Sequence, residues 1–274
     1  MAGAARRLVC QLVVAGLAAT PPVTAGEVVR QYQYRVSWNG IPVARATVTR
    51  TDDQGELRQT TRLSALIRTN SFVDLFWSLR AQSIAEADAL MLRPRWFVFD
   101  RRINGKPELT RIDAEPDGLL VGRYARPGRY RLVEVNNPRA LDPMTAVLRA
   151  LQQPPSAAAP QSYDIFTGEA RYRIELRREA VETIRVPAGR FDAVRIVPTI
   201  WRVEQDKRDP RVRRVAIWVT QSVPHTLLRI RSEVFIGAVY CDLVELPDEG
   251  RGVGLVAEPQ AQLQHDPEVG RTLE

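Results

Sequence analysis

The segment "ETIRVPAGRFDAVRIV", residues 182–197, contains two alternating stretches on either side of a Pro-Ala-Gly turn. Pro187 fixes its own φ angle, and Gly189 supplies a backbone conformation that is costly for other residues. The chain is therefore expected to reverse direction within "VPAGRF" and to form a β-hairpin. In the second arm, one face is expected to carry Phe191, Ala193 and Arg195, and the other Asp192, Val194 and Ile196.

The same alternation runs through most of the chain. It is clear in "YRVSWNG" (34–40), "RYRIEL" (171–176) and "RVAIWV" (214–219), where apolar residues occupy every second position. Strands with polar alternates keep one face in water, which favours an antiparallel sheet. Turn signals such as "NGIP" at residue 39 and "EPDG" at residue 115 recur at short intervals. This pattern predicts a meander of about ten or more strands, in a sandwich or a barrel. We expect a mainly β fold: a large antiparallel meander that forms an open or partly closed barrel with two short helices.

Two segments have helical rather than alternating spacing. In "TNSFVDLFWSL" (69–79), apolar residues recur every three or four positions. In "LDPMTAVLRALQQ" (141–153), Asp142 is a candidate N-cap and Pro143 occupies the first helical position. The apolar side of this second segment consists of Met144, Val147, Leu148 and Leu151. Both helices are expected to serve as lids or plugs over the concave face of the sheet.

The first 25 residues are typical of an export signal. Arg6 and Arg7 precede the apolar run "LVCQLVVAGLAA" (8–19), and small residues follow up to Ala25. The run is shorter than the roughly 20 residues that span a bilayer, although an uncleaved anchor is the alternative interpretation. We expect cleavage near Ala25 and a periplasmic protein, with one β domain over residues 26–246. The tail, residues 247–274, loses the alternation and is expected to be disordered.

Few residues suggest catalysis. The two histidines, His225 and His265, are too few for a histidine-rich metal cluster, and His225 is expected on the surface at the start of a strand. Cys241 is expected to be a small buried hydrophobe in a strand. The chain has no G-x-S-x-G, H-E-x-x-H or P-loop motif. We therefore expect no catalytic residues, no metal, no cofactor and no enzymatic activity.

Arginine is abundant, and the formal net charge is +7. Basic runs occur in "RRINGK" (101–106), "GRYARPGRYR" (122–131) and "KRDPRVRR" (207–214), where arginines alternate with apolar residues as on solvated strand faces. The second interpretation is attraction to anionic lipid, lipopolysaccharide or glycan, because clustered guanidinium groups bind phosphates in a bidentate manner. No nucleic-acid binding is expected of an exported protein.

Several segments together resemble a known family. "YDIFTGEARYRIEL" (163–176), the hairpin extended to Pro198, and "TIWRV" (199–203) resemble the DUF3108 family of bacterial envelope proteins of unknown function. "YRVSWNGIPVARATVT" (34–49) is similar to the opening strand pair of the family. The helix segment at 141–153, and "SFVDLFWSLRAQSIAEADALMLRPRWFVFDRRINGK" (71–106), also match, so the resemblance spans about residues 32–246.

The resemblance implies an exported, mostly antiparallel β protein that is similar in shape to the open-barrel lipid carriers of the Lol type. One departure stands in "AIWVTQSVPHTLL" (216–228), which lacks the aspartate that many members carry before a proline-containing strand. Any role of that aspartate is therefore in doubt for this chain.

Two hypotheses of function follow. The first is a non-enzymatic envelope protein, expected to be a monomer, that holds a lipid or another apolar ligand such as an acyl chain in a half-open barrel. Its candidate ligand-binding residues are aromatic: Trp38, Phe72, Phe76, Trp77, Trp96 and Phe97. The alternative is that these side chains fill a solid core. The second hypothesis is a structural or scaffolding module that contacts other envelope proteins through a sheet edge or its tail. An unfilled apolar cavity of roughly several hundred Å³ would favour the first.

Overall fold

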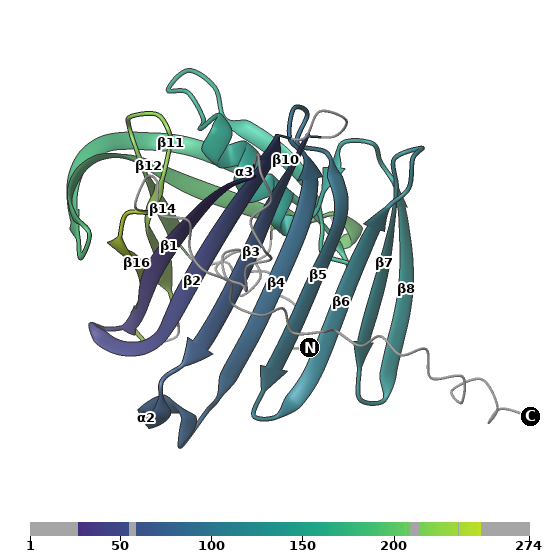
Figure 1. Ribbon diagram of the computed structural model, residues 1–274, viewed down its shortest axis with the longest axis horizontal. Helices are drawn as coiled ribbons and strands as arrows, with labels where there is room; N and C mark the ends of the chain where they lie inside the picture. Colours follow the sequence, from purple (N-terminus) through teal and green to yellow (C-terminus); the bar gives the residue numbers. More distant parts are fainter. Residues whose placement is uncertain (1–26, 55–58, 206, 209–213, 235, 248–274) are drawn as a thin grey trace, which may run out of the picture.

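The computed structural model describes residues 27–54, 59–205, 207–208, 214–234 and 236–247. Across these ranges the chain forms a single sheet of sixteen strands, which confirms the mainly β fold (Figure 1). The predicted export signal and almost all of the predicted tail lie outside the described residues.

The first half of the sheet is a plain meander in which each strand pairs with its neighbour in the chain. Short turns such as Asn39–Gly40 and Asn104–Gly105 connect its strands with positive φ angles, as tight hairpins require. The strands are β1 (Glu27–Trp38), β2 (Ile41–Gln54), β3 (Gln59–Thr69), β4 (Leu79–Asp88), β5 (Pro94–Ile103), β6 (Lys106–Ala114), β7 (Leu119–Arg126) and β8 (Arg129–Asn136).

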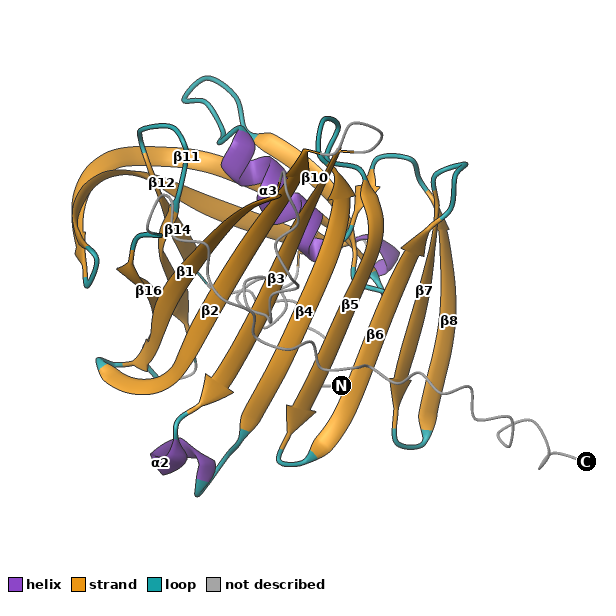
Figure 2. Ribbon diagram, in the orientation of Figure 1, coloured by secondary structure: helices purple, strands orange, loops and turns teal. Residues whose placement is uncertain are grey.

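The second half closes back onto the first. The last strand, β16, pairs with β1, and the order then runs through β15, β14, β12, β11 and β10 to β9. The strands β8 and β9 are thus the two ends of one curved sheet, which forms a nearly closed barrel (Figure 2). The elements are β9 (Ala140–Leu141), α3 (Pro143–Gln152), β10 (Gln161–Phe166), β11 (Arg171–Val186), β12 (Gly189–Arg202), η1 (Val203–Gln205), β13 (Lys207–Arg208), β14 (Val215–Thr220), β15 (Leu227–Glu233) and β16 (Ala238–Glu245).

Close packing joins the two ends of the sheet. A Cβ atom on Gly122 of β7 would lie 2.5 Å from Cζ of Phe166 and 2.7 Å from Cα of Gly168, in the turn after β10. Only glycine permits this approach, because real Cβ atoms do not come so close to other heavy atoms. The turn after β10 therefore packs directly on β7, next to the edge strand β8.

The helix α3 confirms the prediction for residues 141–153. The Asp142 side chain caps it by accepting hydrogen bonds from the backbone N–H groups of Met144 (2.8 Å) and Thr145 (3.0 Å). Met144 and Leu148 are buried against the sheet. Figure 2 shows α3 lying across the interior of the barrel, so this helix is a plug.

A helix does form within residues 69–79, as predicted, but it is short and does not cover the concave face of the sheet (Figure 1). The helix α2 covers only Ser71–Asp74, and both Phe72 in the helix and Phe76 in the turn after it are exposed rather than packed over the concave face. The reason is that Leu79 is the first buried residue of β4, which requires extended backbone directly after the turn. Figure 1 places α2 at the end of the barrel where β3 ends and β4 begins, away from α3.

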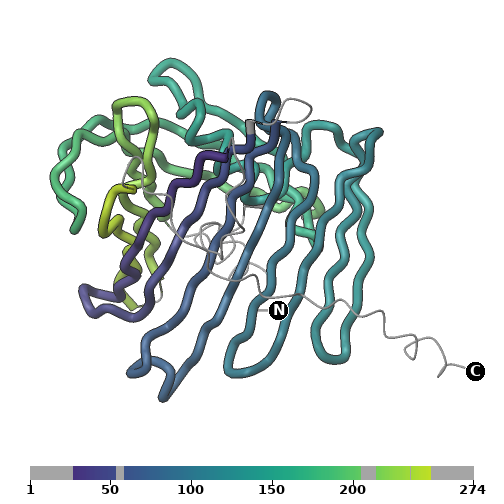
Figure 3. Tube along the Cα trace, viewed as in Figure 1, coloured from purple at the N-terminus to yellow at the C-terminus, as the bar shows by residue number. Residues whose placement is uncertain are grey.

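The segment 182–197 is the hairpin predicted from its turn. Val186 pairs with Gly189 across the two-residue turn, and Gly189 has a φ of +138°. Figure 3 shows the long β11–β12 pair curving outward from the centre of the molecule. Near its tip, the Ala188 N–H donates to the backbone oxygen of Leu243 on β16 (3.1 Å).

Both faces of β12 carry buried residues. Ala193 on one face and Val194 on the other are both buried, and they belong to two different hydrophobic clusters. Val194 belongs to the cluster that contains Ala146 of α3, whereas Ala193 belongs to the cluster that contains Leu243 of β16, so each face is covered by a different layer of side chains. Sequence alternation cannot anticipate this second layer.

Candidate ligand-binding cavity

The interior of the barrel contains a cavity of about 300 Å³. It lies between α3 and the strands that surround the joint of β1 with β16. Its apolar wall consists mainly of Tyr34, Ala46, Val48, Leu63, Val147, Leu148, Leu151, Ile174, Leu176, Ile196, Ile200, Val215, Ile217, Val219, Leu227 and Ile230.

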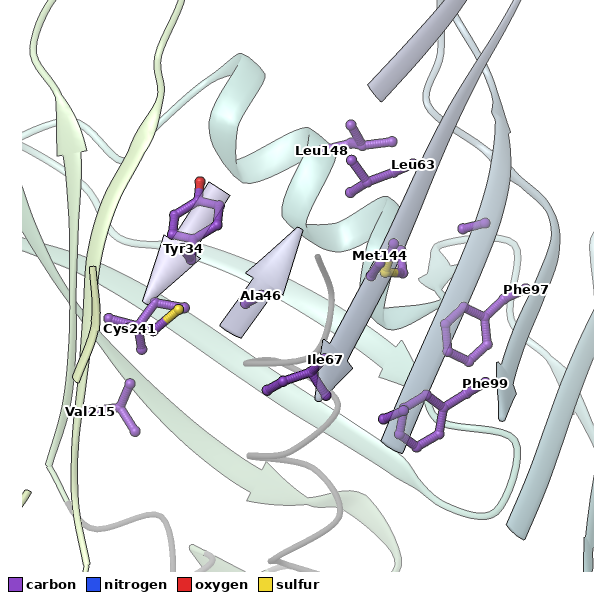
Figure 4. Close-up of a cluster of buried hydrophobic side chains, with 14 of the residues drawn as sticks. Tyr34, Ala46, Leu63, Ile67, Phe97, Phe99, Met144, Leu148, Val215 and Cys241 are labelled. Atoms are coloured by element: carbon purple, nitrogen blue, oxygen red, sulfur yellow. The ribbon is translucent and has the colours of Figure 1, made fainter. Parts of the chain in front are cut away.

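Strand alternation and helix spacing explain why these residues meet. Val215, Ile217 and Val219 are alternate residues of β14, and they face inward together. Leu148 and Leu151 project from the same side of α3. Figure 4 shows Leu148 beside Leu63, with Tyr34, Ala46 and Cys241 on the neighbouring strands. A water molecule needs two to four polar partners to be held in a buried site, and most of this wall offers none. The cavity is therefore suited to an apolar group.

Some of the polar groups in the wall are satisfied by the protein itself. The Tyr34 hydroxyl donates to the backbone oxygen of Leu227 at 3.0 Å, and burial raises the pKa of this phenol well above its usual value. His225 Nδ1 lies 2.9 Å from the backbone oxygen of Thr220. His225 lies two residues before β15 and is half-buried in the cavity wall. The connection between β14 and β15 folds over the cavity and carries His225 with it.

Arg50 gives one part of the wall a positive charge. Its Nε lies 2.9 Å from Oδ2 of Asp52, and Nη1 of Arg30 lies 3.2 Å from the same oxygen. Two guanidinium groups therefore share one carboxylate. The exposed lining residues Gln152 and Val223 lie at the same end of the barrel as Arg50, where α3 ends and β14 turns into β15. This end is the mouth of the cavity.

Cys241 on β16 is a buried lining residue, as predicted from the sequence. Burial, assisted by the neighbouring Asp242, raises the pKa of its thiol to about 12. The thiol is therefore protonated at neutral pH and behaves as a small apolar surface.

The described ranges show no candidate metal-binding group and no helix able to cross a bilayer. No group of three or more His, Cys, Asp or Glu side chains there is arranged to hold a metal ion. None of the described helices has the length and apolarity needed to cross a bilayer.

The six aromatic residues predicted to bind a ligand fall in three places, and none of them lines the cavity. Phe72, Phe76 and Trp77 lie at α2, and Trp38 ends β1 and donates from Nε1 to the backbone oxygen of Ile236 (2.7 Å). Phe72 and Phe76 are brought together, with ring centroids 5.9 Å apart in an edge-to-face arrangement.

The remaining two aromatic residues belong to β5. Phe97 is fully buried in the core, while its neighbour Trp96 is only partly buried on the opposite face. A ligand-binding role for the six residues stays a prediction. Two patterns in the sequence could have indicated the residues that do line the cavity: the apolar face of residues 141–153 and the alternation in β14.

Comparison with solved structures places the fold among β-barrel-like proteins. A β-barrel-like protein of the domain of unknown function DUF1849 from Brucella abortus is 9% identical, with a TM-score of 0.52, over 80% of this chain and 97% of that one. A predicted lipoprotein from Parabacteroides distasonis is 11% identical, with a TM-score of 0.32, over 84% and 99%. A predicted exported protein with a YmcC-like fold from Bacteroides fragilis is 12% identical, with a TM-score of 0.29, over 84% and 99%.

Among curated proteins, no sequence matches this chain. The model of the DUF3108 family, described as a protein of unknown function, matches residues 33–244. The match covers the barrel from β1 to β16, and the chain therefore belongs to the DUF3108 family.

Proposed function

We propose that this protein is a non-enzymatic component of the bacterial cell envelope that binds a lipid or another apolar ligand inside its barrel. The observation that carries the proposal is the apolar cavity of about 300 Å³ between α3 and the sheet. Ligand sites in proteins have volumes of roughly 300–1,000 Å³ and mostly apolar walls. Apolar cavities of only about 150 Å³ already stay dry and bind benzene.

The charge distribution suggests the class of ligand. The wall formed by Val215, Ile217 and Val219 of β14 is apolar, whereas Arg50 and Arg30 share a single carboxylate at the mouth. A molecule with an apolar chain and an anionic head group would match both parts. We therefore favour a single acyl chain with an anionic head over a purely apolar molecule.

The envelope location rests on the sequence. Residues 1–25 combine two arginines, a short apolar run and a small-residue cleavage site, which is typical of secretion. A periplasmic protein with such a cavity would hold acyl chains in water, between membranes.

A scaffolding role is the second candidate, and the edge strand β8 favours it. Tyr130 and Leu132 are exposed on this strand, which has a free hydrogen-bonding edge at the end of the described sheet. Such an edge can accept a strand from another protein.

Extraction of the natively expressed protein tests the ligand hypothesis. Organic extracts of the wild type, analysed by mass spectrometry, are expected to contain a stoichiometric acyl lipid. The variant Ala46→Trp, which places an indole in the cavity, is expected to lose that lipid. The variant Ala180→Trp makes the same change at an exposed position of β11 and is expected to retain it. Equal lipid in both variants, or none in the wild type, would favour the scaffold.

A further inference from the structure

Large apolar side chains gather on the turns at the end of the barrel opposite the cavity mouth. They come from the turn between β1 and β2 and from the segment around α2 (Figure 1). Phe72 is 65% exposed and Phe76 is 77% exposed, values that are unusual for phenylalanine in a folded protein. We call this surface the rim patch; it consists of Trp38, Ile41, Phe72, Leu75, Phe76 and Trp77.

Hydrogen bonds hold the rim patch together. The Asn70 side chain, which caps α2, donates from Nδ2 to the backbone oxygen of Pro42 in β2 (2.7 Å). The carboxylate of Asp74 forms an ion pair with Arg80, which lowers the pKa of Asp74 to about 2 through hydrogen bonds from Arg80 and then Thr69. The turns are thus fixed to the strands, and the aromatic side chains are presented on a defined surface.

A line of arginines crosses the outer face of the sheet next to the rim patch. In the strand register, Arg35 of β1 lies opposite Arg45, Arg45 opposite Arg68, Arg68 opposite Arg80, and Arg80 opposite Arg102. All five side chains are exposed, and their chain neighbours, such as Val36 and Ala44, point into the core. We call these five residues the arginine row.

The arginine row lacks matching negative charge. Arg80 is paired with Asp74, but the other four guanidinium groups form no ion pair with any residue that the structure describes. Like charges placed directly opposite on neighbouring strands destabilise a sheet. At a strand spacing of about 4.8 Å, the row extends over roughly 19 Å. A row of this kind is suited to a surface that presents many anionic groups.

The distance between the rim patch and the arginine row matches the distance between the acyl-chain boundary and the phosphate groups of a lipid surface. Arg35 is three residues from Trp38, and Arg80 is three residues from Trp77, so each arginine backbone lies roughly 10 Å or less from the tip of the rim. Interfacial protein surfaces bury their apolar side roughly 5–10 Å into the boundary between head groups and acyl chains. Long arginine side chains can extend along the barrel to reach the phosphate level.

We propose that the rim patch and the arginine row together dock the barrel on an anionic phospholipid bilayer. The aromatic side chains of the rim patch enter the interface, where tryptophan is favoured, and the guanidinium groups bind lipid phosphates. A second copy of this chain is a poorer occupant, because two arginine rows would repel each other. The cavity mouth lies at the opposite end and stays open to water in the docked state. The proposal does not depend on the cavity being occupied.

Vesicle binding tests the proposal with the purified protein. The wild type is expected to co-sediment with vesicles of 30% phosphatidylglycerol in phosphatidylcholine and to bind pure phosphatidylcholine far more weakly. Each arginine near an anionic surface contributes about 1 kcal/mol, so Arg45→Gln with Arg68→Gln is expected to weaken partitioning about thirty-fold. Phe72→Ser with Phe76→Ser is expected to weaken it at least ten-fold. The matched controls are Arg129→Gln with Arg131→Gln and Tyr130→Ser with Leu132→Ser on the exposed edge strand β8, which should bind as the wild type does.

Loss of vesicle binding can be distinguished from loss of folding, because all of these side chains are exposed. Every variant should therefore keep the circular dichroism spectrum and urea midpoint of the wild type. Failure of the wild type to bind, or equal losses in the rim and β8 variants, would overturn the proposal. Equal binding to neutral and anionic vesicles would also overturn it. Sedimentation velocity tests whether a second copy of this chain occupies the rim patch. A wild-type dimer that dissociates in the Phe72→Ser, Phe76→Ser variant would assign the rim patch to a second copy instead.

Discussion

The Tyr34 hydroxyl donates a hydrogen bond of 3.0 Å to the backbone oxygen of Leu227, and the two residues are 193 positions apart in the chain. They belong to β1 and β15, which are separated in the sheet by β16. This bond therefore joins the first and last parts of the barrel across one wall of the cavity.

Replacement of Tyr34 by phenylalanine tests this bond. Tyr34→Phe removes the hydroxyl but keeps the ring, so we expect the free energy of unfolding to fall by about 1 kcal/mol, the usual net value of one hydrogen bond. Urea denaturation provides the measurement, and Tyr130→Phe on the exposed strand β8 is the control. An unchanged midpoint in Tyr34→Phe would show that the bond does not stabilise the fold.

The N-cap of α3 makes stability depend on pH. Burial raises the pKa of Asp142 from 3.8 to about 6, although hydrogen bonds from Thr145 and Met144 partly oppose the shift. The folded protein therefore holds this proton more tightly than the unfolded chain does. The resulting stabilisation is fully present below pH 3.8 and is lost as the pH rises through about 6. At about 1.4 kcal/mol per pKa unit, the difference amounts to roughly 3 kcal/mol.

Asp142→Asn isolates this effect, since asparagine is an equally good N-cap and does not titrate. The free energy of unfolding of the wild type minus that of the variant is expected to fall as the pH is raised from 4 to 7. Taking the difference removes the contribution of the many surface ion pairs, which change in the opposite direction. A difference that is constant with pH would contradict the assignment.

Two phenylalanines distinguish the rim from the core. Phe97 is fully buried, so Phe97→Ala is expected to cost about 3–5 kcal/mol of unfolding free energy. Phe76 is exposed, and Phe76→Ala is expected to cost well under 1 kcal/mol. Because α2 does not cover the cavity, the Phe76 variant should also bind a fluorescent fatty acid as the wild type does. A large stability loss in Phe76→Ala would mean that α2 packs against the protein in solution.

The sequence predicted most of the secondary structure but little about how the sheet closes into a barrel. Alternation and turn residues predicted the antiparallel strands, and Asp142 with Pro143 predicted α3. The spacing of Phe72, Leu75 and Phe76 predicted a helix, and a short one forms at Ser71–Asp74, but it ends early because β4 begins at Leu79. Helical periodicity does not show whether a segment has anything to cover.

The cavity depended on contacts that are far apart in the chain. The predicted ligand-binding candidates were aromatic, whereas the cavity wall is mostly aliphatic and is formed where α3 meets β12 and β14. The fit of Gly122 against Gly168 depends in the same way on tertiary packing. In the arginine row, each side chain alternates normally along its own strand, so only the strand register brings the five together.

The most direct test of the ligand-binding account is titration of a fluorescent fatty acid into the wild type, Ala46→Trp and Ala180→Trp. Ala46 faces the cavity, and its replacement by tryptophan fills space that the ligand would occupy. The account predicts saturable binding of one probe per chain by the wild type and by the exposed control Ala180→Trp. It also predicts loss of binding by Ala46→Trp, with the circular dichroism spectrum retained; Ala46→Phe is the smaller substitute if the indole prevents folding. A wild type that binds no probe after delipidation, or filled-cavity variants that fold and bind as well as the control, would contradict it.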